Sequence, residues 1–147
     1  MHGTLLLLHV LGATVWTGGH LVLALVVLPR VLRERDAAAL LRFEAGYERI
    51  GIPALLLQVV SGLWLAHLLV PEVGRWFTVD DPVGRLVGVK LTLLALTLAL
   101  AADARFRVIP RLSPQTLGAL AWHIVPVTVL AVLLVVVGVA FRSGWFY

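Results

Sequence analysis

Four long apolar stretches, separated by short charged segments, constrain this sequence more than any other feature. They run from about Leu5 to Leu28, Ile50 to Val70, Leu86 to Ala102 and Leu117 to Phe141. A helix needs about 20 apolar residues to cross the ~30 Å hydrocarbon core of a bilayer. Because lipid offers no partner to backbone polar groups, these stretches are expected to be helical. The sequence therefore predicts an all-α fold, an integral membrane four-helix bundle.

The predicted helices reach beyond some of the apolar stretches and cover about 5–28, 37–70, 86–108 and 116–141. Asp36 is a suitable N-cap for a helix that starts at Ala37. Pro53 is expected to kink that helix, because proline lacks the N–H of one backbone hydrogen bond. Pro29 and Arg30 are expected to end the first helix. With no linker and no repeat, residues 1–147 are predicted to form a single transmembrane domain.

Arginines are unevenly distributed among the connections, which predicts the orientation in the membrane. Between the first and second apolar stretches, the first connection, lie Arg30, Arg33, Arg35, Arg42 and Arg49, and between the third and fourth, the third connection, lie Arg105, Arg107 and Arg111. The second has only Arg75 and Arg85, beside Glu72, Asp80 and Asp81. Because cytoplasmic loops are enriched in Lys and Arg, the first and third connections are predicted to be cytoplasmic. Both termini are then periplasmic, in a multi-pass protein of the bacterial inner (cytoplasmic) membrane.

Aromatic residues fit this orientation. Trp76 and Phe77 in the second connection, and Trp145, Phe146 and Tyr147 at the C-terminus, suit the aromatic belt at the outer interface. The start of the chain lacks the basic segment of a secretory signal. The first apolar stretch is therefore expected to be retained.

Composition limits the kind of site that the chain can build. Only 14% of the residues are charged and 61% are hydrophobic, and the net charge of +4 lies in short loops, which disfavours nucleic-acid binding. There is no cysteine, so disulfides and thiolate metal sites are excluded. Histidine and carboxylate remain as the strong ligand types.

Ionisable residues in the predicted spans suggest an inner polar layer. Counted back from the cytoplasmic turns, five of them lie within roughly 10 Å of depth at 1.5 Å per residue, on all four helices. Histidine and carboxylate ligands on facing helices are typical of transition-metal sites in bundles. The predicted metal ligands are His20, Glu44, Glu48, Asp103 and His123.

A simpler interpretation of the acids is open. Glu44, Glu48 and Asp103 lie near the cytoplasmic interface, where neighbouring arginines can pair with them. Asp103 and Arg107 are spaced i, i+4, which favours an ion pair on one helix face.

A second, outer layer contains His9 and Lys90, and His67 lies near it. His9 and His20 share a helix face but are about 16 Å apart along the axis, which is too far for one metal ion. Lys90 could also extend to the outer surface by snorkelling. A buried histidine with an open coordination position is a possible axial ligand of haem.

Short motifs resemble two membrane protein families. The segment from His9 to Gly19, HVLGATVWTGG, resembles the first helix of CopD-like copper resistance membrane proteins. Leu28-Pro29-Arg30, the run from Tyr47 to Ala54 and on through Ser61-Gly62-Leu63-Trp64, and Lys90-Leu91 resemble the haem-binding HemJ-type protoporphyrinogen oxidases. The resemblance implies a four-helix membrane bundle that holds copper or haem b, with His9 and Lys90 at the positions of the functional pair in the haem-type family.

Three hypotheses follow. The first is a membrane metalloprotein with the inner His/carboxylate site, redox-active or involved in copper handling; copper is the first choice of metal, with iron, zinc and manganese as alternatives. The second is a haem b-binding membrane oxidoreductase that uses His9 and Lys90. The third is a cofactor-free transporter or subunit. Ser61 and Ser113 do not lie at one depth with a histidine and an acid, so a hydrolase is disfavoured and no catalytic residue is predicted.

The expected partners follow from the same features. They are the lipid bilayer, a second copy of the chain, and a small redox or metal-donor protein; no nucleic acid is expected. Glycines on the first two helices allow close packing between protomers.

Overall fold

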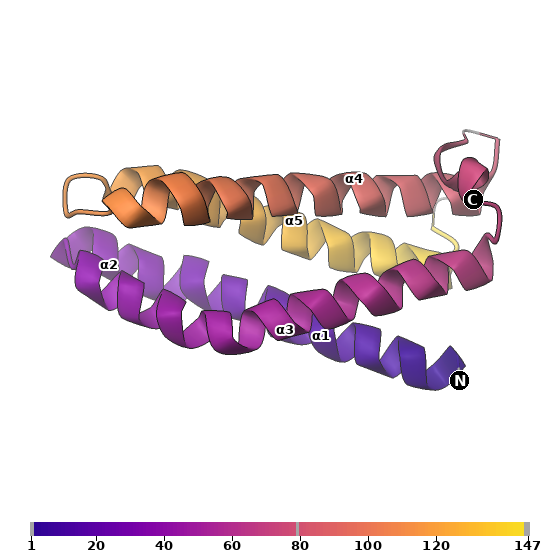
Figure 1. Ribbon diagram of the computed structural model, residues 1–147, viewed down its shortest axis with the longest axis horizontal. Coiled ribbons are helices and arrows are strands. Elements are labelled where there is room, and N and C mark those ends of the chain that lie inside the picture. Colours follow the sequence, from indigo (N-terminus) through magenta and orange to yellow (C-terminus); the bar gives the residue numbers. More distant parts are fainter. Residues whose placement is uncertain (1, 79, 146–147) are drawn as a thin grey trace.

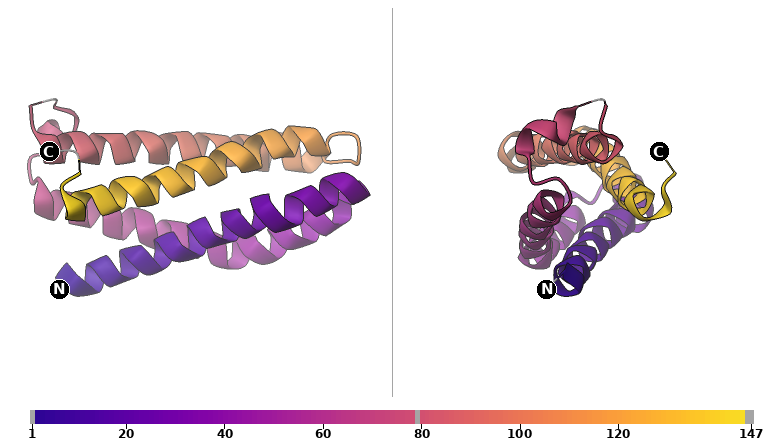
Figure 2. Two further views of the ribbon diagram at one scale, coloured as in Figure 1. Left: turned by 180° about the vertical axis from the view of Figure 1, so that it is seen from behind. Right: turned by 90° about the vertical axis from the view of Figure 1, so that its right-hand side faces the viewer.

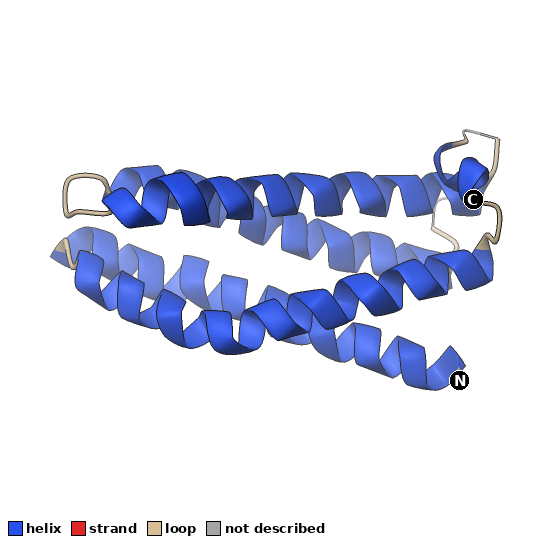
Figure 3. Ribbon diagram, in the orientation of Figure 1, coloured by secondary structure: helices blue, strands red, loops and turns tan. Residues whose placement is uncertain are grey.

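The computed structural model describes residues 2–78 and 80–145 and confirms the all-α prediction (Figure 3). No strand occurs in this part of the chain. Four helical units are long and apolar enough to span a membrane: His2–Glu34, Ala37–Leu69, Pro82–Arg111 and Leu117–Phe141. The N- and C-terminal ends of the chain lie at one end of the bundle, called here the terminal end (Figure 1). The opposite end, with the first and third connections, is called the arginine-rich end.

The first unit continues past the point where its proline was expected to end it. It consists of α1 (His2–Val22), a π-helical segment η1 (Leu23–Val27) and α2 (Leu28–Glu34). A proline within a helix removes one hydrogen bond and crowds the preceding turn. The wider π-helical turn, which ends at Val27 two residues before Pro29, provides that room. The helix ends at Glu34, and the following residue, Arg35, has a left-handed φ of 55°.

The second unit begins as expected. It is the helix α3 (Ala37–Leu69), and the Asp36 side chain accepts a hydrogen bond from the Ala39 N–H at 2.8 Å. The N-cap prediction is thus confirmed. Pro53 lies inside α3, which bends along its length (Figure 1). The predicted range of 37–70 agrees with the observed helix to within one residue.

At the terminal end, a short helix η2 (Val73–Phe77) leads from α3 to α4 (Pro82–Asp103). Trp76, which was expected in the aromatic belt at the outer interface, packs inside the protein. Trp76 is buried against Val70 and Val87, and its Nε1–H donates to the Val70 carbonyl at 2.8 Å. Phe77 is exposed, and its place in an aromatic belt stays a prediction. Phe146 and Tyr147 lie outside the described residues.

The third unit also extends further than predicted. After α4 come a π-helical segment η3 (Ala104–Val108) and a 3-10 turn η4 (Ile109–Arg111) that contains Pro110. The last helix is α5 (Leu117–Ser143).

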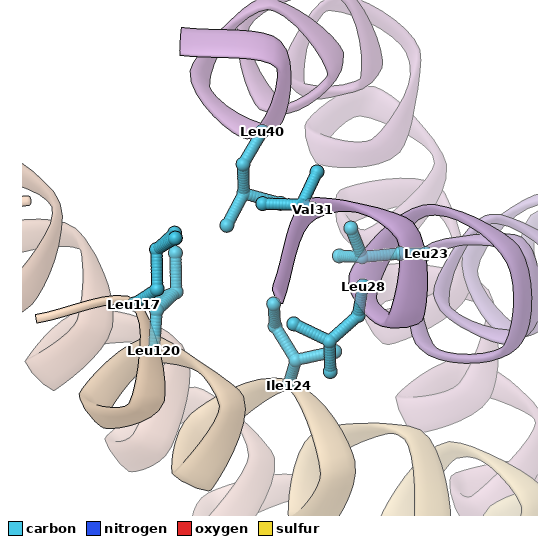
Figure 4. Close-up of a cluster of buried hydrophobic side chains, with 7 residues drawn as sticks. All are labelled: Leu23, Leu28, Val31, Leu40, Leu117, Leu120 and Ile124. Atoms are coloured by element: carbon cyan, nitrogen blue, oxygen red, sulfur yellow. The ribbon is translucent and has the colours of Figure 1, made fainter. Parts of the chain in front are cut away.

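The helices pack mainly in two pairs, α1 with α3 and α4 with α5, and α1 joins the pairs through α5 (Figure 2). Because lipid tails are as apolar as the side chains, close van der Waals packing holds such helices together. At the arginine-rich end, apolar side chains of three helical units point toward one another (Figure 4). This cluster is Leu23, Leu28, Val31, Leu40, Leu117, Leu120 and Ile124.

Candidate functional site

A cavity of about 190 Å³ lies inside the bundle, next to the apolar cluster at the arginine-rich end. Leu23, Leu120 and Ile124 belong both to the cluster and to the cavity wall, so packing closes the cavity on that side. Four of the five predicted site residues also line it: His20, Glu44, Glu48 and His123. Asp103 is the exception, and it reaches the site through His123.

His20 presents an open ring nitrogen. The side chain is buried, and its Nδ1 lies 2.9 Å from the Trp16 carbonyl oxygen. A carbonyl can only accept, so Nδ1 carries the proton and Nε2 has the lone pair. Histidine ligands of metals are commonly oriented in this way, with one nitrogen bonded to a carbonyl and the other directed at the ion.

Tyr47 supports the same arrangement from α3. Its hydroxyl donates to the Trp16 carbonyl at 3.0 Å, and its ring stands edge-on to the His20 ring, with 5.6 Å between centroids. A Cβ atom on Gly19 would collide with the Tyr47 ring, and one on Gly51 would come within 2.8 Å of it. The two glycines therefore leave the space that Tyr47 occupies beside His20.

Glu44 brings a carboxylate without a direct partner into the cavity. Its i, i+4 neighbour Glu48 pairs with Arg105, at 3.3 Å between Oε1 and Nε. Glu44 makes no hydrogen bond or ion pair with any residue in 2–78 or 80–145. Its carboxylate interacts with the charges of Glu48 and Arg105 only at longer range. A charged group in a membrane span is costly unless it is compensated. The cavity wall is therefore suited to a cation.

His123 and Asp103 are engaged with each other. His123 Nε2 lies 2.8 Å from Asp103 Oδ2, and its Nδ1 lies 2.9 Å from the Ala119 carbonyl. Both ring nitrogens of His123 thus face acceptor oxygens, one on a carboxylate and one on a backbone carbonyl. Arg107 also pairs with Asp103 at 3.0 Å, so the i, i+4 ion pair expected from the sequence is present as well.

The five predicted ligands thus converge without forming a complete coordination sphere. Among residues 2–78 and 80–145, no group of three or more His, Cys, Asp or Glu side chains is close enough to hold a metal ion. His20 and Glu44 have open ligand atoms, whereas Glu48, Asp103 and His123 are paired. The metal site remains a prediction.

The outer layer is separate from this cavity. His9 bonds to α3 through Nδ1, at 2.9 Å from the Gln58 carbonyl, and it interacts electrostatically with Lys90 on α4. Neither residue lines the cavity. His67 is exposed. The use of His9 and Lys90 for haem stays a prediction.

Sequence reasoning gave no role to Trp16 and Tyr47. Trp16 lines the cavity, and its ring is tilted by 45° to the His20 ring with 4.3 Å between centroids. Its buried indole N–H has no hydrogen-bond partner in the described chain. The signal for Tyr47 was available, since Glu44, Tyr47, Glu48 and Gly51 follow the i, i+3, i+4, i+7 spacing of one helix face.

Comparison with known families gives one match. The family model of copper resistance protein D, CopD, matches residues 41–141, which run from α3 through α5. The chain belongs to the CopD family. It is therefore a membrane protein linked to copper resistance. No curated protein and no solved structure gives a significant match.

The CopD match includes four predicted site residues and leaves one outside. Glu44, Glu48, Asp103 and His123 lie within residues 41–141. His20 and His9 lie on α1, before the matched region. The structure brings His20 to the same cavity as Glu44, Glu48 and His123, which the family match by itself does not indicate.

Proposed function

We propose that this CopD-family protein handles copper through the cavity, with His20 and Glu44 as the primary ligands and Glu48 beside them. The observation that carries the proposal is the presence of two open ligand atoms on the wall of one cavity. One is the free Nε2 of His20, and the other is the carboxylate of Glu44, which has no direct partner among the described residues. The predicted ligands His123 and Asp103 supply a paired neighbour at the edge of the site.

The donor set selects the oxidation state of the ion. Imidazole and carboxylate suit Cu(II), whereas Cu(I) prefers thiolate and thioether ligands. The chain has no cysteine and a single methionine, Met1. We therefore assign Cu(II) as the ion that binds at the cavity. Iron, zinc and manganese also accept these donors, and they serve as competitors in the test.

The proposal is tested by Cu(II) titration of the detergent-purified protein. We expect His20→Ala and Glu44→Gln each to weaken Cu(II) binding by at least about tenfold, because even partners outside the ligand shell are worth 10–100-fold. Glu48→Gln, Asp103→Asn and His123→Ala should lower the bound metal less. Glu72→Gln is the matched control, since Glu72 is exposed and pairs with Arg75 at the terminal end. Full metal occupancy in all five site variants would refute the proposal.

An absorption spectrum of the same sample separates this function from the haem alternative. Near-stoichiometric copper without a Soret band supports the cavity site. A Soret band that is lost in His9→Ala would instead assign the protein to haem chemistry at the outer layer. Protein that keeps its fold and binds neither copper nor haem would favour the cofactor-free transporter or subunit.

A further inference from the structure

A second polar layer crosses the bundle closer to the terminal end than the cavity does. It contains His9 of α1, Gln58 and Ser61 of α3, and Lys90 of α4. None of these side chains lines the cavity that contains His20. Since all four helical units approach it, with Phe141 of α5 facing Lys90, the layer is a site of its own.

Lys90 provides a positive charge without an anionic partner. Its Nζ lies 5.9 Å from the centroid of the Phe141 ring, and it would be 3.6 Å from a Cβ atom on Gly138. The ammonium thus packs against α5. No carboxylate of the described residues lies within ion-pair distance of it, and the titratable group that it interacts with is His9. A cation–π contact offsets only part of the cost of a charge in a membrane span.

His9 adds a fixed acceptor. Its Nδ1 donates to the Gln58 carbonyl at 2.9 Å, so Nε2 carries the lone pair. The Ser61 hydroxyl lies 3.2 Å from Nδ1 and itself donates to the Leu57 carbonyl at 2.6 Å. A Cβ atom on Gly62 would come within 2.8 Å of His9 Cε1. The ring is therefore held in place by α3.

Gln58 adds a second acceptor that lacks a donor. Its Oε1 is buried and has no hydrogen-bond partner in the described chain. The layer thus contains one cation without an anion and two acceptors, His9 Nε2 and Gln58 Oε1, without a donor. Ordered water could donate to the acceptors, but it would leave the charge uncompensated. An ionised carboxylate would compensate the charge, but it has no proton to donate.

We propose that this layer binds a singly protonated phosphate group. An anionic oxygen accepts from the Lys90 ammonium, and the P–OH donates to His9 Nε2 or Gln58 Oε1. His9 and Lys90 are only half-buried, so the group can enter from outside the bundle. The phosphate can belong to a phosphate-monoester lipid or be free in solution.

The depth of the layer suits a lipid head group. Lys90 lies eight residues into α4, which is about 12 Å of helix. The first helical unit has 33 residues, or about 50 Å at 1.5 Å per residue, which exceeds the ~30 Å hydrocarbon core. The surplus at each end places the layer close to the boundary between acyl chains and head groups.

The test uses the full chain in detergent, with short-chain phosphatidic acid, short-chain phosphatidylcholine and inorganic phosphate as probes. We expect phosphatidic acid to raise the melting temperature saturably and phosphatidylcholine, which has no P–OH and no net charge, to have no effect. Lys90→Met should weaken phosphatidic acid binding at least about tenfold. Arg85→Gln, which removes a cation from the same helix, should leave it unchanged. Lys90→Arg keeps the charge and should retain binding, so the test holds even if Lys90→Met fails to fold.

Competition by inorganic phosphate identifies the source of the group. If phosphate displaces phosphatidic acid, the phosphate alone is sufficient; if it does not, the lipid is required, and either result supports the site. Equal binding of the two lipids, or unchanged affinity in a folded Lys90→Met variant, overturns the proposal. So does a Soret band that depends on His9, because iron ligation would then account for the open Nε2. Copper binding at the cavity is measured separately and is independent of these outcomes.

Discussion

Two glycines beside Tyr47 explain how a large ring fits between α1 and α3. Gly19 on α1 and Gly51 on α3 face the ring from opposite helices, and neither has room for a Cβ atom. We predict that Gly19→Ala destabilises the protein by about 1–3 kcal/mol, the usual cost of overpacking. The measurement is unfolding of the purified protein by SDS titration.

The neighbouring glycine provides a control for this substitution. A Cβ atom on Gly18 would meet nothing within 4 Å, so Gly18→Ala should be neutral or stabilising by up to about 1 kcal/mol, as expected for a glycine in a helix. Equal destabilisation by both substitutions would mean that helix flexibility, rather than the space for Tyr47, sets the requirement at Gly19.

The Tyr47 hydroxyl and the His20 ring share one acceptor, the Trp16 carbonyl. Tyr47→Phe keeps the ring but removes that hydroxyl. We expect Cu(II) affinity to fall several-fold, by less than in His20→Ala, while the melting temperature changes little, because Tyr47 positions His20 and does not bind the ion. The nitrogen hyperfine pattern in the EPR spectrum of bound Cu(II) should broaden. Unchanged affinity and spectrum would contradict this positioning role.

Residue-level contacts were only partly predictable from the sequence. The i, i+4 spacing of Asp103 and Arg107 predicted a local ion pair, and it is present. The Asp103–His123 contact joins two helices, and depth counting indicated only that the two residues lie at similar heights. Glu44 lacks a direct partner in part because the nearby Arg105 forms its ion pair with Glu48. Tertiary packing determines which acid pairs with which arginine, and the sequence alone does not show it.

At the scale of elements, the N-cap of α3 is a local feature that the sequence specifies. Asp36 accepts from the Ala39 N–H, and an N-cap typically contributes about 1 kcal/mol. We predict that Asp36→Ala lowers the free energy of unfolding by about that amount, measured by SDS titration, and that Asp36→Asn restores most of it. If Asn fails to restore stability, the contribution comes from the Arg42 ion pair, at 3.8 Å, instead of the cap.

The ends of the first and third helical units were less predictable. Prolines at 29 and 110 favoured helix ends there, yet each is preceded by a π-helical segment, and the helical structure continues to Glu34 and Arg111. A single-residue insertion in the hydrogen-bonding pattern has no strong signature in residue type. The burial of Trp76, which lies in η2, was missed for a similar reason. An aromatic residue in a connection can face the membrane interface or pack against the helices, and the sequence does not distinguish the two.

At the scale of the whole molecule, hydropathy alone predicted the number of spans, because a lipid environment permits few alternatives. It did not predict which helices pair. The cavity exists because α3 and α4 meet little outside their connection, while α1 bridges to α5. The two proposed sites, for copper and for a phosphate head group, lie at different depths of one bundle. Each contains a histidine of α1, His20 or His9, whose Nε2 has no hydrogen-bond partner among the described residues.

We propose that the arginine-rich end faces the cytoplasm and the terminal end the periplasm. At the terminal end Arg75 is paired with Asp81 at 3.0 Å. Most arginines of the chain lie at or near the other end, as expected for the cytoplasmic side. Because the chain has no cysteine, single cysteines report orientation without background. A membrane-impermeant maleimide added to intact spheroplasts should label Gly74→Cys, in exposed η2, and should label Gln115→Cys, between η4 and α5, only after permeabilisation. The reverse labelling pattern would invert the orientation and place the copper cavity in the periplasmic half of the bundle, where the ion would enter from the opposite side.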